Sequence, residues 1–336
     1  MSMESFSAPL NQNGNYIATP VAFDDAGRFY DLIQEQAEQH SYADGGDKIQ
    51  HAHALYTAIA ETKELQAFLI KDAGKKETVG AVTYFDCWTP FGHGVYLEDI
   101  ITTKSRRAKG VGHFAMETLA QTTLKKGFKS LAWECASTNV NALRFYSRLG
   151  SETLNDRHTW RYIGSFADKA PKETIFIEDM AQKMIAYDLP ESGFGFDTSH
   201  KDMSMLTLRG AANELLGRAV SYRNYSTFRQ VSGMHMEVLS VESGDRYFIE
   251  ELIRGQMQKQ AANKWTGHLD ITVLRGQEKP LVGVLEDMGF HPLSYGDDRM
   301  VPHFMREDML SCLAYGSCVP ANRKMRLTRQ LSLNSL

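Results

Sequence analysis

A basic, glycine-containing turn is the segment whose residue types point most clearly to chemistry. It reads Arg106-Arg107-Ala108-Lys109-Gly110-Val111-Gly112 and is followed at once by a predicted helix over residues 110–126. Gly110 and Gly112 let backbone amides approach an anion without side chains in the way, and the helix start adds unpaired N–H groups and the positive end of its dipole. The basic side chains of the turn add formal charge. The turn therefore predicts a site for an anion the size of a pyrophosphate.

This turn differs from the two common nucleotide-binding loops. It is not a Walker A loop, because no Gly-Lys-Ser or Gly-Lys-Thr follows it, and it lacks the first glycine of a dinucleotide-binding fingerprint. Glycine-rich turns are common, so the neighbouring elements must narrow the choice. The hydrophobic pattern predicts a strand over 95–103 before the turn. After the turn it predicts a strand over 130–136, a helix over 139–149 and a final strand over 158–163.

The order of these elements resembles that of the GNAT acetyltransferase superfamily. The motif Asn139…Phe145-Tyr146…Leu149-Gly150 in the last helix is part of the resemblance. Three further segments, which cover Tyr84 to Trp88, Tyr96 to Asp99 and Trp160-Arg161, resemble the diamine (spermidine/spermine) N-acetyltransferase family over about residues 15–165. The resemblance implies an α/β fold with a mixed sheet (α+β), acetyl-CoA as co-substrate, and direct attack of an amine on the thioester.

The resemblance also implies how acetyl-CoA is held. The backbone of the strand would pair with the pantetheine arm, the turn would cradle the pyrophosphate, and the helix that follows the next strand would contact the cofactor from its first turn. The implied cofactor-binding residues are Ile100, Ile101, Thr102, Arg107, Ala108, Lys109, Gly110, Val111, Gly112, His113, Asn139 and Ala142.

Two residues are implied in the reaction itself. Glu98 would take a proton from the attacking amine through a water, because an alkylammonium has a pKa of about 10.4 and must lose a proton first. Tyr146 corresponds to the residue that protonates the departing thiolate. Since a tyrosine near pKa 10 is a weaker acid than a thiol near 8.5, that transfer costs roughly 2 kcal/mol, and Tyr146 needs help from its surroundings or acts mainly as a hydrogen-bond donor. Cys135 invites a covalent alternative, but it has no base partner in the sequence and is expected to be a buried strand cysteine.

A small cationic amine is the predicted acceptor. Carboxylates and aromatic ring faces suit such a group. The predicted substrate-binding residues are Asp86, Trp88, Glu98, Asp99 and Trp160. Two acidic positions of the family fall on His40 and His158, which leaves open a polyamine, a diamine, an amino acid with a side-chain amine, or a lysine or N-terminus of a protein. A non-catalytic module that senses CoA or a polyamine is the alternative from another class.

The second half of the chain repeats the first at a spacing of 139 residues. In this register Glu98 faces Glu237 and Gly150 faces Gly289, and the predicted strands and helices agree in order. The replacements at the site are Gly110 by Ile249, Gly112 by Glu251 and Tyr146 by Leu285. A branched side chain and a carboxylate are therefore expected in the turn of the second copy. The sequence predicts tandem GNAT-like folds, the N-terminal copy intact and the C-terminal copy degenerate and without cofactor binding.

Composition and charge set the remaining limits. The chain has 336 residues, of which 43% are hydrophobic and 23% charged, and its net charge of −4 argues against general nucleic-acid binding. No cysteine or histidine spacing suggests a metal site. No signal peptide or membrane-spanning stretch is predicted, so a cytoplasmic location is expected, and a homodimer or a protein partner through the second half is left open. The predicted division is a catalytic domain over 1–165, a second GNAT-like domain over 166–320 and a basic tail over 321–336.

Overall fold

A computed structural model describes fifteen segments of the chain. They are residues 10–39, 48–89, 92–154, 157–163, 166, 177–179, 185–186, 195–196, 203–209, 215–227, 229–241, 243–262, 267–274, 278–295 and 298–316. The predicted basic tail over 321–336 and His40 lie outside the described residues.

The first sheet has nine strands, and two of them come from the far end of the chain. Its strands are β1 (Asn11–Gln12), β2 (Tyr16–Pro20), β3 (Gln66–Asp72), β4 (Thr78–Thr89), β5 (Gly92–Thr102), β6 (Ser130–Ala136), β7 (Glu152–Thr153), β17 (Ser294–Tyr295) and β18 (Asp298–Arg306). Their order is β1-β2-β3-β4-β5-β6-β18-β17, with β7 paired to β18. Only β5 and β6 are parallel neighbours.

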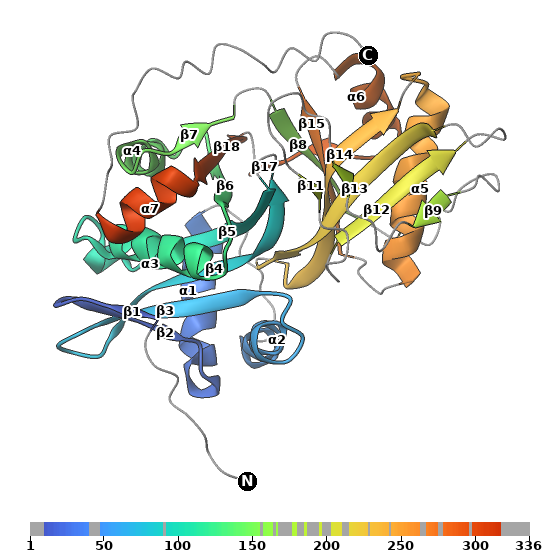
Figure 1. The fold of residues 1–336 in the computed structure, drawn as a ribbon. Coiled ribbons are helices and arrows are strands. Elements are labelled where there is room, and N and C mark those ends of the chain that lie inside the picture. Colours follow the sequence, from blue (N-terminus) through green and yellow to red (C-terminus); the bar gives the residue numbers. More distant parts are fainter. Residues whose placement is uncertain are drawn as a thin grey trace.

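Helices cover both faces of this sheet (Figure 1). They are α1 (Ala26–Gln39), α2 (Lys48–Ala60), α3 (Val111–Lys125), α4 (Val140–Arg148) and α7 (Glu307–Tyr315), with short 3-10 turns η1 (Phe23–Asp25) and η2 (Lys104–Arg106). The helices predicted over 110–126 and 139–149 appear as α3 and α4.

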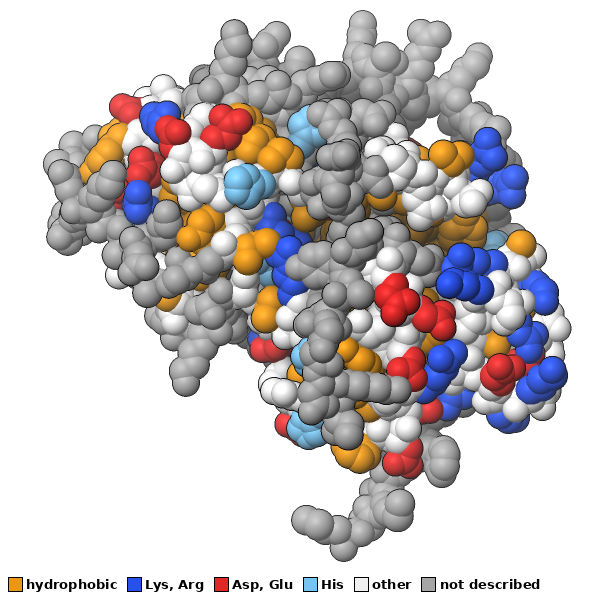
Figure 2. All heavy atoms as spheres, turned by 180° about the vertical axis from the view of Figure 1, so that it is seen from behind, with side chains coloured by type: hydrophobic (Ala, Val, Ile, Leu, Met, Phe, Trp, Pro, Cys, Tyr) orange, Lys and Arg blue, Asp and Glu red, His pale blue; other side chains and the backbone are white. Residues whose placement is uncertain are grey.

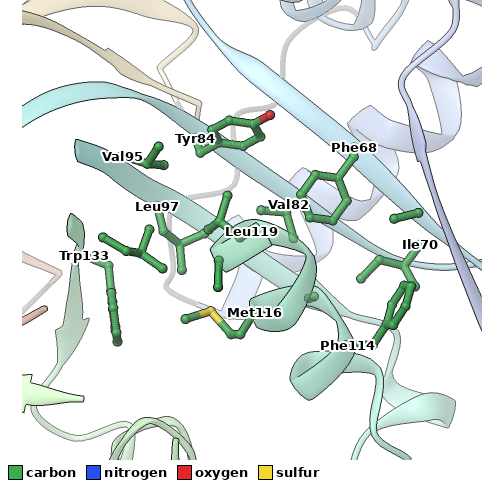
Figure 3. Packing of buried hydrophobic residues seen from close by; sticks show 14 of the residues in the cluster. Phe68, Ile70, Val82, Tyr84, Val95, Leu97, Phe114, Met116, Leu119 and Trp133 are labelled. Carbon is green, nitrogen blue, oxygen red and sulfur yellow. The ribbon is translucent and has the colours of Figure 1, made fainter. Parts of the chain in front are cut away.

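The core between α3 and the first sheet fixes where α3 begins relative to the strands. Figure 3 shows Phe114, Met116 and Leu119 of α3 packed against side chains of β4 and β5 such as Val82 and Leu97. Each of these side chains is buried, and full burial of one contributes about 1.5–3 kcal/mol. The helix start is therefore held firmly against the end of β5.

A second sheet of seven strands forms the other lobe. Its strands are β8 (Arg157–Tyr162), β9 (Ile177–Asp179), β12 (Met203–Arg209), β13 (Leu215–Ser226), β14 (Val231–Val241), β15 (Leu269–Leu274) and β16 (His291–Pro292), in the order β16-β8-β15-β14-β13-β12-β9. Helices α5 (Arg246–Ala262) and α6 (Glu278–Asp287) pack on it, and β10 (Ile185–Ala186) pairs with β11 (Gly195–Phe196) separately.

The two sheets exchange their last strands. The strand predicted over 158–163 is present as β8, but it pairs with β15 of the second sheet instead of completing the first. In return β18, from the end of the described chain, pairs with β6 of the first sheet. Figure 1 shows the green β8 among the yellow and orange strands, and the red β18 and α7 among the green elements. A cut at the boundary predicted near residue 165 would separate the first sheet from β17 and β18, and the second sheet from β8.

Both halves carry a β-bulge at the same place, which agrees with the predicted repeat. In the first half the extra residue of β5 is Glu98, because the residues paired with β4 on either side are Leu97 and Asp99. In the second half the extra residue of β14 is Glu237. A bulge bends the strand and redirects one side chain, so both halves turn a glutamate at this point.

Side chains of both charges lie on the described surface (Figure 2). On the face seen in Figure 2, Lys and Arg side chains are interspersed with Asp and Glu side chains and form no single basic patch. Among the described helices, none has the length and apolar character needed to cross a bilayer.

Candidate active site

The basic turn delays the start of α3. Gly110 precedes the helix with φ of 87°, and Ala108 also has a positive φ, of 58°. The first helical hydrogen bond runs from the Phe114 amide to the Gly110 carbonyl at 3.0 Å. The amides of residues 111–113 therefore lie ahead of that bond, at the positive end of the helix, where they can meet an anion.

Contacts with the neighbouring strands hold this turn. The Tyr16 hydroxyl donates to the Lys109 carbonyl at 2.5 Å. The Arg106 guanidinium lies 3.0 Å from the Asp72 carboxylate and 3.5 Å from that of Glu77, so its charge is largely taken up by the β3–β4 turn. Arg107 and Lys109, in contrast, are exposed beside the glycine.

Close packing also requires the second glycine of the turn. A Cβ atom on Gly112 would lie 3.3 Å from the Phe145 ring of α4. At the start of α4, the Asn139 side-chain oxygen accepts a hydrogen bond from the Ala142 amide at 3.1 Å. Asn139 is thus the cap of α4, and only its side-chain NH2 group remains for a ligand.

One edge of β5 is open beyond the point where the two parallel strands part. The last paired residues of β5 and β6 are Tyr96 and Ala132. From there Ile100, Ile101 and Thr102 pair with β4 on one side, and no described strand pairs with them on the other. An unpaired strand edge presents amide and carbonyl groups to an extended ligand. The turn and this edge are the places where the resemblance implies the diphosphate and the pantetheine arm of acetyl-CoA.

Two adjacent carboxylates lie where the strands part, and they differ in environment. The buried Asp99 accepts hydrogen bonds from Gln36 at 2.9 Å, from the Thr83 hydroxyl at 2.8 Å and from the Thr227 hydroxyl at 2.5 Å. These donors favour an ionised Asp99 even though burial raises its pKa. Burial and the neighbouring Asp99 charge raise the pKa of Glu98 well above its ordinary value. Glu98 is therefore the member of the pair that takes up a proton.

The second half of the chain supplies part of this acidic site. Thr227 lies in the turn between β13 and β14, fully buried, and its backbone N–H donates to the Glu98 carboxylate. Arg161 of β8 binds Asp270 through two hydrogen bonds of 2.6 and 2.7 Å, and its charge lowers the pKa of Glu98 in part. Sequence reasoning missed Thr227, because nothing in a lone threonine 128 residues away signals such a contact.

Tyr146 is buried on α4 in an aromatic cluster. Its ring centroid lies 5.0 Å from that of Trp133 and 5.3 Å from that of His303, a residue of the exchanged strand β18. Burial raises the pKa of Tyr146 above its usual value, so the hydroxyl stays protonated and acts as a donor. Burial also raises the pKa of Cys135 to about 11, which keeps it a thiol and gives the covalent alternative no support.

The structure does not bring all the predicted substrate-binding residues together. The Asp86 carboxylate lies 2.5 Å from Lys126 Nζ and accepts a 2.8 Å hydrogen bond from Gln66, so its charge is already paired. Trp160 packs in the core of the second sheet.

Phe304 of β18 pairs with Ala132 of β6, whereas Trp160 of β8 pairs with Ile271 of β15, the residue that corresponds to Ala132 in the repeat. Phe304 therefore has the same position in the first sheet that Trp160 has in the second. Trp88 is buried and stacks on His93 at 4.7 Å, while Glu98 and Asp99 lie where β5 and β6 part. His158, where the family has an acid, lies on β8.

Comparison with known proteins agrees with this geometry. Residues 28–150 match the acetyltransferase (GNAT) family. The chain is 27% identical to L-ornithine N5-acetyltransferase of Arabidopsis thaliana over 117 residues, which cover 34% of this chain and only about half (51%) of that enzyme. It is 29% identical to thialysine N-epsilon-acetyltransferase of Bos taurus over 143 residues, which cover 40% of this chain and 84% of the enzyme.

A likeness in fold extends over both halves. A GCN5-related N-acetyltransferase from Sphaerobacter thermophilus aligns with 88% of this chain and 97% of its own length, at a TM-score of 0.51 and 11% identity. Together with the bulge shared by β5 and β14, this likeness confirms the predicted tandem arrangement of two GNAT-like folds. Residues 28–150 are therefore similar to the acetyltransferase (GNAT) family, whose members use acetyl-CoA.

Proposed function

We propose that the chain transfers the acetyl group of acetyl-CoA to a primary amine of a small cationic acceptor. The observation that carries the proposal is the position of Glu98, a half-buried carboxylate at the bulge where β5 leaves β6. Its raised pKa brings it closer to that of an alkylammonium, and a base works best when the two values approach each other.

Different residues of this chain would carry out the separate steps of the reaction. The amides of residues 111–113 would hold the diphosphate, and the open edge of β5 would pair with the pantetheine arm. Bound acetyl-CoA supplies a thioester as the acetyl donor. Glu98 takes one proton of the ammonium through a water, after which the neutral nitrogen attacks the carbonyl carbon and a C–N bond forms. The C–S bond then breaks, and the second proton that the nitrogen loses neutralises the departing CoA thiolate. Tyr146 stabilises the departing sulfur by hydrogen bonding, which suits a hydroxyl whose pKa is raised.

The acceptor we favour is a diamine or an amino acid with a side-chain amine, ahead of a long polyamine. The names of the two relatives describe acetylation of the side-chain amines of ornithine and thialysine. Asp86 is engaged by Lys126 and Trp160 belongs to the second core, so two of the residues expected to bind the cationic amine are occupied elsewhere, and fewer groups remain for an acceptor with several amines.

Release of the CoA thiol, read with a thiol reagent, tests the proposal. The acceptors are ornithine, thialysine, a diamine, spermidine and a lysine peptide, each with the full chain and with the Glu98→Gln variant. We expect kcat/KM for the best small amine to fall by about 10²–10⁴-fold in the variant, with unchanged affinity for acetyl-CoA. Transfer to the peptide alone would make the chain a protein acetyltransferase. Binding of acetyl-CoA without thiol release would make it a sensing module.

The pH profile gives a second readout of the same base. The base must be ionised to accept a proton, so kcat/KM is expected to rise with pH through the pKa of Glu98. Because burial and Asp99 raise that pKa, kcat/KM should increase at a pH above the ordinary titration range of a glutamate. A profile that is flat above pH 5 in the full chain would contradict this role.

A further inference from the structure

A cavity of about 50 Å³ lies between the two sheets at the exchanged strands. It is lined from both halves, and its lining does not include Glu98, Asp99 or Tyr146. At roughly 10–15 Å³ for each water position, this room suits a few waters or the end of a short alkyl chain. The cavity therefore adjoins the site described above without including its proposed base and donor. Tyr96, two residues before Glu98, borders it, as do Trp133 and His303, on which Tyr146 packs.

The charges around the cavity do not cancel. Glu237 forms an ion pair of 2.6 Å with Arg157, and its other oxygen faces His235 at 3.4 Å. Glu134, on β6, accepts one hydrogen bond of 2.6 Å from the Thr159 hydroxyl. Within the described segments no Lys, Arg or His nitrogen forms a direct ion pair with Glu134, and His235 and Arg161 lower its pKa only from a greater distance, without outweighing its burial. A carboxylate in such a place attracts a positive charge.

Aromatic rings surround this carboxylate. Trp88, Tyr96 and Tyr222 line the same cavity, and they come from β4, β5 and the second-half strand β13. A cation within about 6 Å of a ring face is attracted to the ring, and ammonium groups use this attraction together with a carboxylate. Burial raises the pKa of Glu134, and a bound cation would favour its ionised form.

We propose that this cavity binds an alkylammonium group, held by the Glu134 carboxylate and by the ring faces of Trp88, Tyr96 and Tyr222. The group has two sources, a second amine of the acceptor or a separate small amine. The first source rests on the proposed function, because Glu134 on β6 and Glu98 on β5 both lie two residues beyond the last pair of these strands. Binding as such does not depend on catalysis.

Titration of the full chain with propylammonium, without acetyl-CoA, tests binding. Calorimetry would compare the unaltered chain with Glu134→Gln, with Glu98→Gln and with the control Glu117→Gln on α3. Glutamine keeps an oxygen for the Thr159 hydroxyl but removes the charge. We expect the dissociation constant to rise about tenfold or more in Glu134→Gln and to stay within about twofold in the control Glu117→Gln. Glu98→Gln affects only the binding of propylammonium at the proposed acceptor site. Equal affinity in Glu134→Gln and the unaltered chain, or loss of binding in Glu98→Gln alone, would overturn the proposal.

A ring variant covers the case in which Glu134→Gln does not fold. Tyr96→Leu removes a ring and keeps every charge, and we expect about threefold weaker binding of propylammonium. Unchanged affinity in Tyr96→Leu would then count against the site.

Kinetics with a diamine and the matching monoamine separate the two sources. If the second amine of the acceptor is the ligand, Glu134→Gln raises KM for the diamine alone. If a separate amine is the ligand, the variant weakens propylammonium binding and changes neither KM. Absence of any thiol release would contradict the proposed function, whereas the binding titration would still test this site by itself.

Discussion

The two halves of the molecule begin their central helix in different ways. In the first half β5 ends at Thr102 and α3 begins at Val111, whereas in the second half β14 ends at Val241 and α5 begins at Arg246. At the spacing of the repeat, Arg246 corresponds to Arg107. The helix of the second half therefore takes over the whole stretch that forms the anion turn in the first.

This difference corrects the expectation that Ile249 and Glu251 obstruct a turn in the second copy. Both residues lie inside α5 and are buried, and Ile249 belongs to the core of the second sheet. The glycine at positive φ before α5 is Gly244, which corresponds to residue 105 and not to Gly110, so the helix can begin at Arg246. Hydrophobic side chains such as Ile249 favour a helix packed on the sheet. The anion site is lost because the turn itself is absent. Leu285, which corresponds to Tyr146 in the repeat, is likewise a core residue of α6.

The bulge glutamates show the same divergence. Glu98 has a raised pKa beside Asp99, while the pKa of Glu237 is lowered, because the Arg157 and His235 contacts outweigh the effect of its burial. One inherited backbone feature thus presents a base in the first half and an ion pair in the second.

Cutting the chain at the predicted boundary should have the largest effect. A chain of residues 1–165 keeps β8 but lacks β18 and α7, so β6 has an exposed edge and α3 loses a packing partner. We expect no cooperative thermal unfolding by circular dichroism and no acetyl-CoA binding. Co-expression with residues 166–336 restores both exchanged strands and should restore binding. A cooperative 1–165 fragment with full affinity would show that the halves are independent.

The strand exchange also marks the limit of what the sequence could predict. Local sequence patterns predicted α3, α4 and β6, and they placed the start of α3 after the basic turn, because glycine position and hydrophobic spacing act within a few residues. They also placed a strand at β8 correctly. Alternation along β8 cannot say which sheet edge accepts it, and for that reason Trp160 was expected beside Glu98 and is instead in the second core. Thr227 and His303 were missed for the same reason, since their partners are distant in sequence.

Transplanting the second copy's residues into the turn tests whether the glycines make the difference. The double variant Gly110→Ile, Gly112→Glu places a branched residue at φ of 87° and a carboxylate at the anion site. We expect affinity for acetyl-CoA, measured by calorimetry, to fall about 100-fold or more, which corresponds to about 2.7 kcal/mol. Gly127→Glu, at φ of 76° just beyond the other end of α3, is the matched control. If both variants bind equally well, the turn does not hold the diphosphate.

Replacing Tyr146 by Phe tests the second difference at the site, the donor that the second copy lacks. The change keeps the packing against Trp133 and removes only the hydroxyl. Loss of one hydrogen bond to a developing thiolate should lower kcat by about tenfold or more, with little change in acetyl-CoA affinity. Phe145→Leu on the same helix controls for altered packing. Equal kcat in Tyr146→Phe and the unaltered chain would remove the hydroxyl from the reaction.

Thr227→Val tests whether the second half tunes the base of the first, and the expected effect is the smallest. The Thr227 hydroxyl lowers the pKa of Asp99, so its removal lets the acidic pair hold its proton to higher pH. The rising limb of kcat/KM should move up by about half to one pH unit, since one hydrogen bond is worth about 0.5–1.5 kcal/mol and one pH unit about 1.4. Activity should therefore fall severalfold near neutral pH and recover at higher pH. Thr227→Ser restores the donor and should restore the midpoint, whereas a general loss of folding would lower activity at every pH. A midpoint that stays in place in Thr227→Val would mean that the second half covers the acidic pair without setting its protonation.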